Sequence, residues 1–273
     1  MNAFSSTFGR LRGVVIGMVH LRALPGTPAV TLSMQEIIEV ACKEAKIYKD
    51  AGVDAVMVEN MHDVPYVHST GVGHEITASM SVVCSHVKEV CGSMPVGVQV
   101  LAGANKQAIA VALSSGLQFI RAEGFVFSHV ADEGLMNACA AELLRYRKQI
   151  GASHIQVFTD IKKKHSSHSI TSDISIAETA KAAEFFLSDG VIVTGAVTGA
   201  SADLQEFKDV QKAVKIPVLI GSGVTVDNVE QYASANAFII GSYFKCGGHW
   251  SNEIDPTRVA KFMEKVKLKI QTP

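Results

Sequence analysis

The stretch GVVIGMVHLRALPG, from Gly13 to Gly26, distinguishes between the two fold classes that the rest of the chain allows. Its first half is apolar along its whole length, which is typical of a strand in a parallel sheet that is covered on both faces. The dinucleotide-binding pattern G-x-G-x-x-G, which marks the first strand of many doubly wound open sheets, does not follow it. The stretch therefore favours a closed (β/α)8 barrel over an open sheet.

Seven further apolar runs follow the first one, and segments with helical spacing separate them. The runs begin near residues 54, 95, 119, 154, 190, 216 and 237. Between the first two runs, Ser33 to Gly52 repeats apolar residues at three- and four-residue spacing and ends at a glycine. Eight strand–helix units in about 250 residues match a TIM barrel. We therefore predict an α/β fold with a single (β/α)8 TIM-barrel domain over residues 13–273.

The composition indicates a globular protein that is rich in core-forming residues. The chain has 273 residues, of which 48% are hydrophobic and 19% charged. A chain of this size buries about three quarters of its unfolded surface, so it needs neither a disulfide nor a metal for stability. The net charge of -1 provides no basic excess for nucleic acid, and no apolar run reaches the ~18 residues of a membrane span. We therefore expect no nucleic-acid partner and no membrane span. The sequence does not decide between a monomer and a homo-oligomer.

The cysteines and residues 1–12 indicate the cellular compartment of the protein. The five cysteines are odd in number and form no C-x-x-C pair, which indicates reduced thiols in a reducing compartment. Residues 1–12, MNAFSSTFGRLR, contain two arginines and no acid, a composition typical of a weak mitochondrial presequence. The alternative is a short terminus that plugs the barrel or trails from it. We expect the cytoplasm or the mitochondrial matrix.

The fifth apolar run ends at the rim where TIM barrels build their active sites. It stops at Asp160 and continues as IKKKHSSHS, residues 161–169. Such a charged run is often a solvated loop, but the C-terminal ends of barrel strands carry the catalytic residues. We interpret Asp160, Lys164 and His165 as site residues, with Lys164 holding Asp160 ionised. Lys162 and Lys163 are expected to divide between rim and solvent, and loss of Lys163 is expected to have little effect on turnover.

Polar residues also mark the ends of the first four runs. They are His20 in the first run, Glu59 and Asn60 in the second, Gln99 in the third, and Arg121 with Glu123 in the fourth. Alternation places Arg121 and Glu123 on one face, as a buried ion pair or as an anion-binding arginine beside a general acid or base.

The last two runs end in the glycine-rich sequences LIGSGVTVDNV and IIGSYFKCGG. TIM barrels often bind phosphate between the loops after strands seven and eight, where backbone N–H groups approach it closely. We predict a phosphate site built from Gly221, Ser222, Gly223, Gly241, Ser242 and Lys245, with Thr194 and Gly195 after the sixth run lining the same pocket. The histidines of residues 62–74 lack the spacing of a zinc site, so no metal and no cofactor is predicted.

Several motifs together resemble the BtpA family, TIM-barrel proteins named for a cyanobacterial member linked to photosystem I accumulation. They include GVVIGMVHLRALPGTP, DAVMVENMHDVPY, DIKKKHSSHSI, VIVTGAVTGASAD and IIGSYFKCGGHWSNEIDPTRVAKFM. The resemblance runs from about Gly13 to the end of the chain. Carried over by position, it implies site residues at His20, Glu59, Asn60, Asp63, Arg121, Asp132, Asp160, Lys164, His165, Thr194, Gly195, Thr198, Gly199, Gly221, Ser222, Gly223, Asn228, Gly241 and Lys245. The sequence departs from the family pattern after the third and fourth runs, which leaves the substrate preference open.

Two functions of different classes follow. The first is an enzyme that acts on a small phosphorylated sugar or nucleoside-like compound by proton transfer or by C–N or C–O cleavage, as a lyase, isomerase or glycosidic-bond hydrolase. Its catalytic residues would be Asp160, Lys164, Glu59, His165 and Asp132. The second is a ligand-regulated assembly factor without chemistry, which a large apolar surface patch away from the rim would favour.

Overall fold

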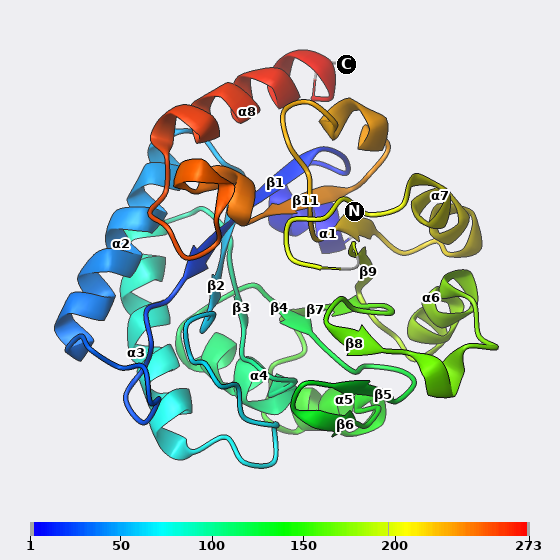
Figure 1. Cartoon of the computed structure of the whole chain (residues 1–273), viewed down its shortest axis with the longest axis horizontal. Helices are drawn as coiled ribbons and strands as arrows, with labels where there is room; N and C mark the ends of the chain where they lie inside the picture. Colours follow the sequence, from blue (N-terminus) through cyan, green and yellow to red (C-terminus); the bar gives the residue numbers. More distant parts are fainter. Residues whose placement is uncertain (1–2, 196, 272–273) are drawn as a thin grey trace.

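The computed structural model describes residues 3–195 and 197–271, and within them eight parallel strands close into a barrel (Figure 1). The predicted TIM-barrel fold is therefore confirmed. In order around the ring the strands are β1 (Val14–His20), β11 (Ala237–Ile240), β10 (Val218–Ile220), β9 (Gly190–Val193), β7 (Gln156–Asp160), β4 (Phe119–Ala122), β3 (Val96–Gln99) and β2 (Ala55–Glu59).

Helices cover the outside of the barrel, as the strands' continuous apolar character requires. They are α2 (Met34–Asp50), α3 (His74–Cys91), α4 (Asn105–Ser114), α5 (Ala140–Gln149), α6 (Ile176–Phe185), α7 (Leu204–Ala213) and α8 (Pro256–Lys269). The helix α2 begins at a capping box in which Ser33 and Glu36 satisfy each other's backbone N–H groups. Between β10 and β11 the connection is instead the short 3-10 helix η2 (Val229–Tyr232).

Two of the loops at the C-terminal ends of the strands form a small antiparallel sheet. The loop after β4 contributes β5 (His129–Ala131) and β6 (Gly134–Met136), and the loop after β7 contributes β8 (Ser166–Ser167). Ala131 pairs with Ser166. The charged run that begins after Asp160 is therefore fixed against a hairpin rather than free in solvent.

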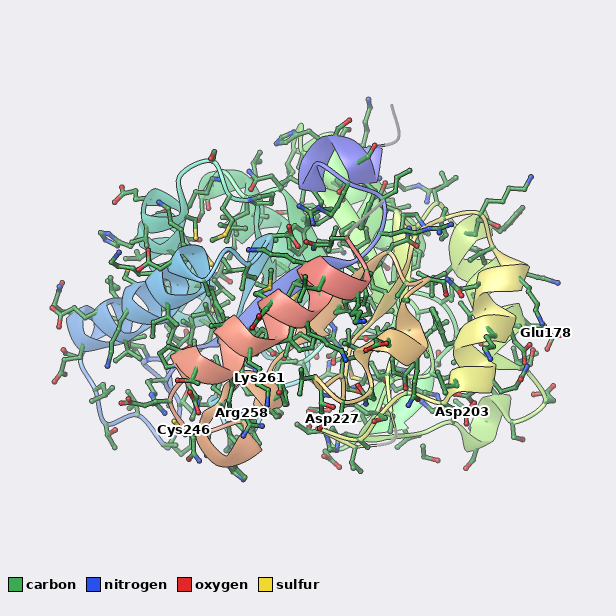
Figure 2. The ribbon with its side chains drawn as sticks, turned by 90° about the horizontal axis from the view of Figure 1, so that it is seen from above. Glu178, Asp203, Asp227, Cys246, Arg258 and Lys261 are labelled. Carbon is green, nitrogen blue, oxygen red and sulfur yellow. The ribbon has the colours of Figure 1, made fainter. Side chains whose placement is uncertain are left out.

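The opposite end of the barrel interior is apolar and is closed by the N-terminal helix α1 (Ala3–Phe8). Phe4 and Phe8 are buried and contact the aromatic rings of Phe158 and Phe119 inside the barrel. Figure 2 shows α1 at the edge of the molecule opposite to Arg258. The presequence hypothesis for residues 1–12 stays a prediction, and the described part of this segment plugs the barrel. It packs on the predicted domain rather than trailing from it.

Candidate functional site

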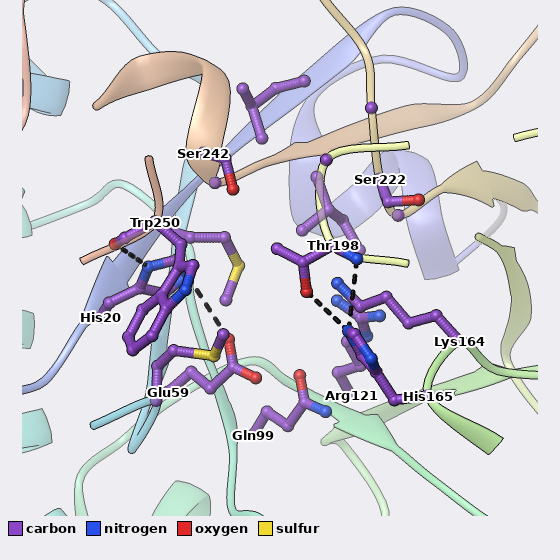
Figure 3. Close-up of a pocket in the computed structure, with 18 of the residues that line it drawn as sticks. His20, Glu59, Gln99, Arg121, Lys164, His165, Thr198, Ser222, Ser242 and Trp250 are labelled. Atoms are coloured by element: carbon purple, nitrogen blue, oxygen red, sulfur yellow. Dashed lines mark hydrogen bonds and ion pairs between the residues drawn. The ribbon is translucent and has the colours of Figure 1, made fainter. Parts of the chain in front are cut away.

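A cavity of about 420 Å³ opens at the C-terminal ends of the strands, within the usual size range of small-molecule sites (Figure 3). Most of the predicted site residues line it: His20, Glu59, Arg121, Asp132, Asp160, Lys164, His165, Gly221, Ser222, Gly223, Gly241 and Ser242. Because every barrel strand ends at this rim, residues far apart in the sequence meet there.

The buried carboxylate Asp160 is bound by Arg121 rather than by the predicted Lys164. The Arg121 Nε and Nη2 atoms donate to the two carboxylate oxygens of Asp160 at 2.9 and 2.8 Å. Both side chains are buried, with 7% and 1% of their surface exposed. Such a bidentate pair fixes both groups, so Arg121 rather than Lys164 is the direct partner of Asp160, and Lys164 interacts with Asp160 only through its charge.

The middle lysine of the run, Lys163, is also paired inside the rim. Its ammonium lies 3.3 Å from a carboxylate oxygen of Glu123, and both side chains are nearly buried. The other Glu123 oxygen accepts a hydrogen bond from the Gly103 N–H at 2.9 Å. The expected Arg121–Glu123 pair is therefore replaced by two separate pairs. Lys163 lies inside the rim rather than toward solvent, and its small effect on turnover stays a prediction.

The backbone of the same loop adopts left-handed conformations at two residues that have side chains. Lys162 has φ of 43° and His165 has φ of 54°. Residues other than glycine rarely adopt such angles, and they cluster at functional sites. Between them, Lys163 and Lys164 both line the cavity.

Lys164 enters the cavity without a carboxylate partner within 4 Å among the described residues. Its backbone N–H donates to the Thr194 hydroxyl at 3.2 Å, which places the residue at the end of β9. Burial lowers the pKa of Lys164, and the nearby Arg121 charge lowers it further. The amine is therefore more easily deprotonated than a surface lysine.

His20 and Glu59 form a second titratable pair on the other side of the cavity (Figure 3). The His20 Nδ1 lies 3.1 Å from the backbone oxygen of Trp250, so Nδ1 carries the proton of the neutral ring. Its Nε2 then presents a lone pair 3.6 Å from a Glu59 carboxylate oxygen. Burial lowers the pKa of His20 to about 3 and raises the pKa of Glu59. The His20 imidazole is therefore neutral, and the Glu59 carboxyl group retains its proton more readily than an exposed glutamate does.

His165 links two rim loops instead of reaching the centre of the cavity. Its Nε2 accepts from the backbone N–H of Thr198 at 3.2 Å and lies 2.8 Å from the Thr198 hydroxyl. Burial lowers the pKa of His165, and Lys164 lowers it further. A neutral His165 therefore holds the loop after β9 against the loop after β7.

The glycine-rich loop after β10 lines the cavity and carries backbone donors that are not used within the described part of the fold. No acceptor in the described part of the chain receives the N–H groups of Ser222, Gly223 and Val224. The Ser222 hydroxyl is already used, since it accepts from Gly195 at 2.6 Å. Gly223 has φ of 65°, and a side chain there would overlap the backbone of Ala200. The loop is therefore shaped for close approach of an anion to backbone N–H groups.

The predicted phosphate cation Lys245 lies elsewhere. Its ammonium is 2.8 Å from a carboxylate oxygen of Glu44 on α2, and its side chain is 1% exposed. The short 3-10 helix η3 (Ser242–Phe244) follows β11 and turns Lys245 away from the cavity. The prediction that Lys245 lines the phosphate site is therefore wrong.

Arg258, which the sequence interpretation missed, lines the cavity beside the same loops. It belongs to the first turn of α8, its Nε donates to the backbone oxygen of Tyr243 at 2.6 Å, and its guanidinium lies 4.6 Å from the Tyr243 ring centre. No carboxylate lies within 4 Å of it in the described residues. The aspartate–proline helix start at Asp255 was a usable signal, because it places the next residues at the rim.

Other predicted residues support the site from behind. Asn60 accepts from the Leu101 N–H at 2.8 Å and donates to Asp63 at 2.9 Å, which fixes two rim loops. Thr194 and Gly195 hold Lys164 and Ser222 through the bonds described above. Asp132 is exposed and lines the cavity from the turn between β5 and β6. Among the described residues, no group of three or more His, Cys, Asp or Glu is placed to hold a metal.

Comparison with known proteins gives concordant matches. The profile of the BtpA family matches residues 12–268. A mitochondrial protein of Caenorhabditis elegans, named as uncharacterised, is 52% identical, with 93% of each chain covered. The photosystem I biogenesis protein BtpA of Synechocystis is 34% identical, over 92% of this chain and 86% of that protein. Tryptophan synthase of Mycobacterium tuberculosis superposes with a TM-score of 0.62 at 14% identity, covering 99% of this chain and 97% of that one, which shows the fold alone.

Proposed function

The chain belongs to the BtpA family, and we propose that it is an enzyme that acts on a small phosphorylated sugar or nucleoside-like compound. The observation that supports this most is one cavity that holds both an acid–base constellation and a glycine loop with free N–H groups. In a site of this composition, the loop binds the anionic end of the substrate, and the acid–base groups act on the other end of the substrate.

The acid–base constellation consists of groups whose pKa values move toward neutrality from opposite sides. Burial lowers the pKa of Lys164 and raises that of Glu59. Both shifts bring the pKa closer to neutral pH than that of an exposed lysine or glutamate, which favours general acid–base catalysis. Lys164 is the proposed base and Glu59 the proposed acid, with the neutral His20 ring beside the Glu59 carboxyl group. The reaction class is proton transfer or C–N or C–O cleavage.

The buried pair Arg121/Asp160 and the hydrogen-bonded His165 have positioning roles in this proposal. Asp160 fixes the guanidinium, whose charge depresses the pKa of Lys164. His165 keeps the lysine-bearing loop against the loop after β9. Substitution of Arg121, Asp160 or His165 should therefore lower turnover by changing the placement of Lys164.

The phosphate end is proposed at Gly221, Ser222, Gly223, Gly241 and Ser242. Backbone N–H groups would provide the hydrogen bonds, and Arg258 would provide the charge in place of Lys245. Arginine suits this task because its planar donor pairs match phosphate oxygens.

Two measurements test the proposal. Calorimetry with inorganic phosphate should show binding that Ser242→Asp abolishes, since the new carboxylate adds a charge of the wrong sign to the cavity lining. A turnover screen of sugar phosphates and nucleotides should identify a substrate whose turnover falls about 100-fold in Lys164→Met. Absence of phosphate binding in the unaltered protein would exclude the site, and equal turnover in Lys164→Met would exclude the assigned base.

A second candidate function is a non-catalytic assembly factor, which one surface feature favours. Phe185, Phe186 and Leu187 at the end of α6 are 82%, 45% and 71% exposed. This helix begins at the rim and ends at the start of β9, so the triplet lies at the opposite end of the barrel. Phosphate binding without turnover of any compound in the screen would favour this function.

We place the protein in the cytoplasm or the mitochondrial matrix. The cysteines Cys42, Cys84, Cys91, Cys139 and Cys246 are all free. In the described part of the chain, no helix is long and apolar enough to cross a membrane. A fluorescent fusion carrying residues 1–12 that reaches mitochondria would support the matrix, and a diffuse signal would support the cytoplasm.

A further inference from the structure

The end of the cavity away from the glycine loop is aromatic and apolar. Trp250, Tyr66, Met61 and Leu101 line it. The Trp250 ring contacts His62, with ring centres 4.9 Å apart, and stacks on His249 at 5.9 Å; it also borders the cavity in Figure 3. Aromatic walls of this kind bind flat rings by stacking.

The position of this wall is fixed by the backbone around it. The Trp250 carbonyl oxygen accepts from His20, and the next carbonyl, that of Ser251, accepts from Arg22 at 3.1 Å. The Tyr66 hydroxyl donates to the backbone oxygen of Met61 at 2.7 Å. The wall therefore exists before a ligand binds, and little conformational freedom is lost when one stacks on it.

Gln99 lines the same cavity and carries a buried polar atom without a partner. Its side chain belongs to β3, the residue is 2% exposed, and its Oε1 has no hydrogen-bond partner among the described residues. A buried unpaired carbonyl oxygen is costly, and a ligand N–H would satisfy it. A glutamine side chain presents an acceptor beside a donor, which matches a ring edge with one donor beside one acceptor.

We infer that the cavity contains a subsite for a flat, heteroaromatic ring, which stacks on Trp250 while its hydrogen-bonding edge faces Gln99. This inference rests on the proposed function and narrows its substrate class to phosphorylated nucleosides or similar ring-bearing phosphates. The phosphate lies at the glycine loop and the ring at the aromatic end. The bond that links ring and sugar phosphate then lies between Lys164 and Glu59, both of which line the same cavity.

The chain contains one tryptophan, so its fluorescence reports on this subsite directly. The 5′-monophosphates of adenosine, guanosine, cytidine and uridine would be titrated with excitation at the red edge of tryptophan absorption, beside ribose 5-phosphate and inorganic phosphate. At least one nucleotide should quench the fluorescence saturably. Ribose 5-phosphate should displace that nucleotide without quenching by itself.

Three variants separate the ring subsite from the phosphate site. Gln99→Met should weaken binding of the quenching nucleotide about 10-fold or more and leave the affinity for ribose 5-phosphate unchanged. Trp250→Leu, measured by equilibrium dialysis, should have the same selective effect. Gln156→Met is the matched control. Its Oε1 is also buried and unpaired, but Gln156 is absent from the described lining of the cavity, so nucleotide affinity should not change.

The outcomes distinguish the two proposals. If ribose 5-phosphate binds but no nucleotide quenches, or if ribose 5-phosphate quenches equally, the ring subsite is wrong while the phosphate site stands. If none of the compounds binds, the proposed function fails as well. If Gln99→Met fails to fold, Trp250→Leu, whose side chain is only partly buried, still tests the stacking.

Discussion

Replacing Asp160 by asparagine should destabilise the fold, because the carboxylate balances a buried arginine. The Arg121 guanidinium uses two donors on Asp160, and the two side chains are 7% and 1% exposed. Asparagine keeps the shape of the side chain, but it removes the charge and places an amide NH2 group against one of the guanidinium donors. A buried cation then stays without its counter-ion.

The magnitude follows from what surrounds Arg121. Removing one partner of a buried ion pair costs about 3–5 kcal/mol. The carboxylates of Glu59 and Glu123 also favour the charged form of Arg121 and remain in the variant, so the lower end applies. A loss of about 3 kcal/mol corresponds to a melting temperature lower by roughly 6–12 °C, at about 2–4 °C per kcal/mol for a large domain.

Urea unfolding and calorimetry of Asp160→Asn would measure this loss. The control is Glu142→Gln, which removes a pair with Lys106 at 2.7 Å whose side chains are 76% and 48% exposed. Exposed pairs contribute little, so this variant should unfold like the unaltered protein. A melting temperature of Asp160→Asn within about 2 °C of that of the control would refute the view that the stability of the fold depends on this buried ion pair.

Three further outcomes are expected. Lys163→Met should lower the free energy of unfolding by about 2–3 kcal/mol, measured with urea, because buried Glu123 loses its counter-ion; a neutral effect would place Lys163 in solvent. Arg258→Gln should weaken phosphate binding about 10-fold in calorimetry, whereas Lys261→Gln, one turn further along α8, should not; equal affinities would remove Arg258 from the site. The pKa of His20 is about 3 in the fold against 6.5 in an unfolded chain, so only the unfolded state gains this proton between those values. Stability is then lost as pH falls from about 6.5 toward 3, and His20→Gln should flatten that part of the stability curve; an unchanged curve contradicts the assignment.

The barrel strands and the rim positions could be predicted because both depend on local sequence. Each strand is buried on two faces, so its apolar run is continuous and its first polar residue marks the rim. His20, Glu59 and Asp160 were found in this way, and all three line the cavity. The glycines after β10 followed from the same reasoning.

The partners of the charged residues could not be predicted, because loop geometry selects them. β4 ends at Ala122, so strand alternation no longer places Glu123 on the face of Arg121. The left-handed backbone at Lys162 then brings Lys163 to Glu123. Lys245 meets Glu44 across 201 residues, a contact that no local pattern contains.

The two ends of the barrel interior depend on each other. Burial is the largest cause of the pKa shifts of His20, Glu59 and Lys164, and burial at the rim requires an interior below it that excludes water. The aromatic layer around Phe158 fills that interior, and α1 closes it from the far end. Water admitted from below would solvate the charged forms of the rim groups and return their pKa values toward the ordinary ones. The pKa shifts at the rim therefore depend on apolar packing at the other end of the interior, to which α1 contributes.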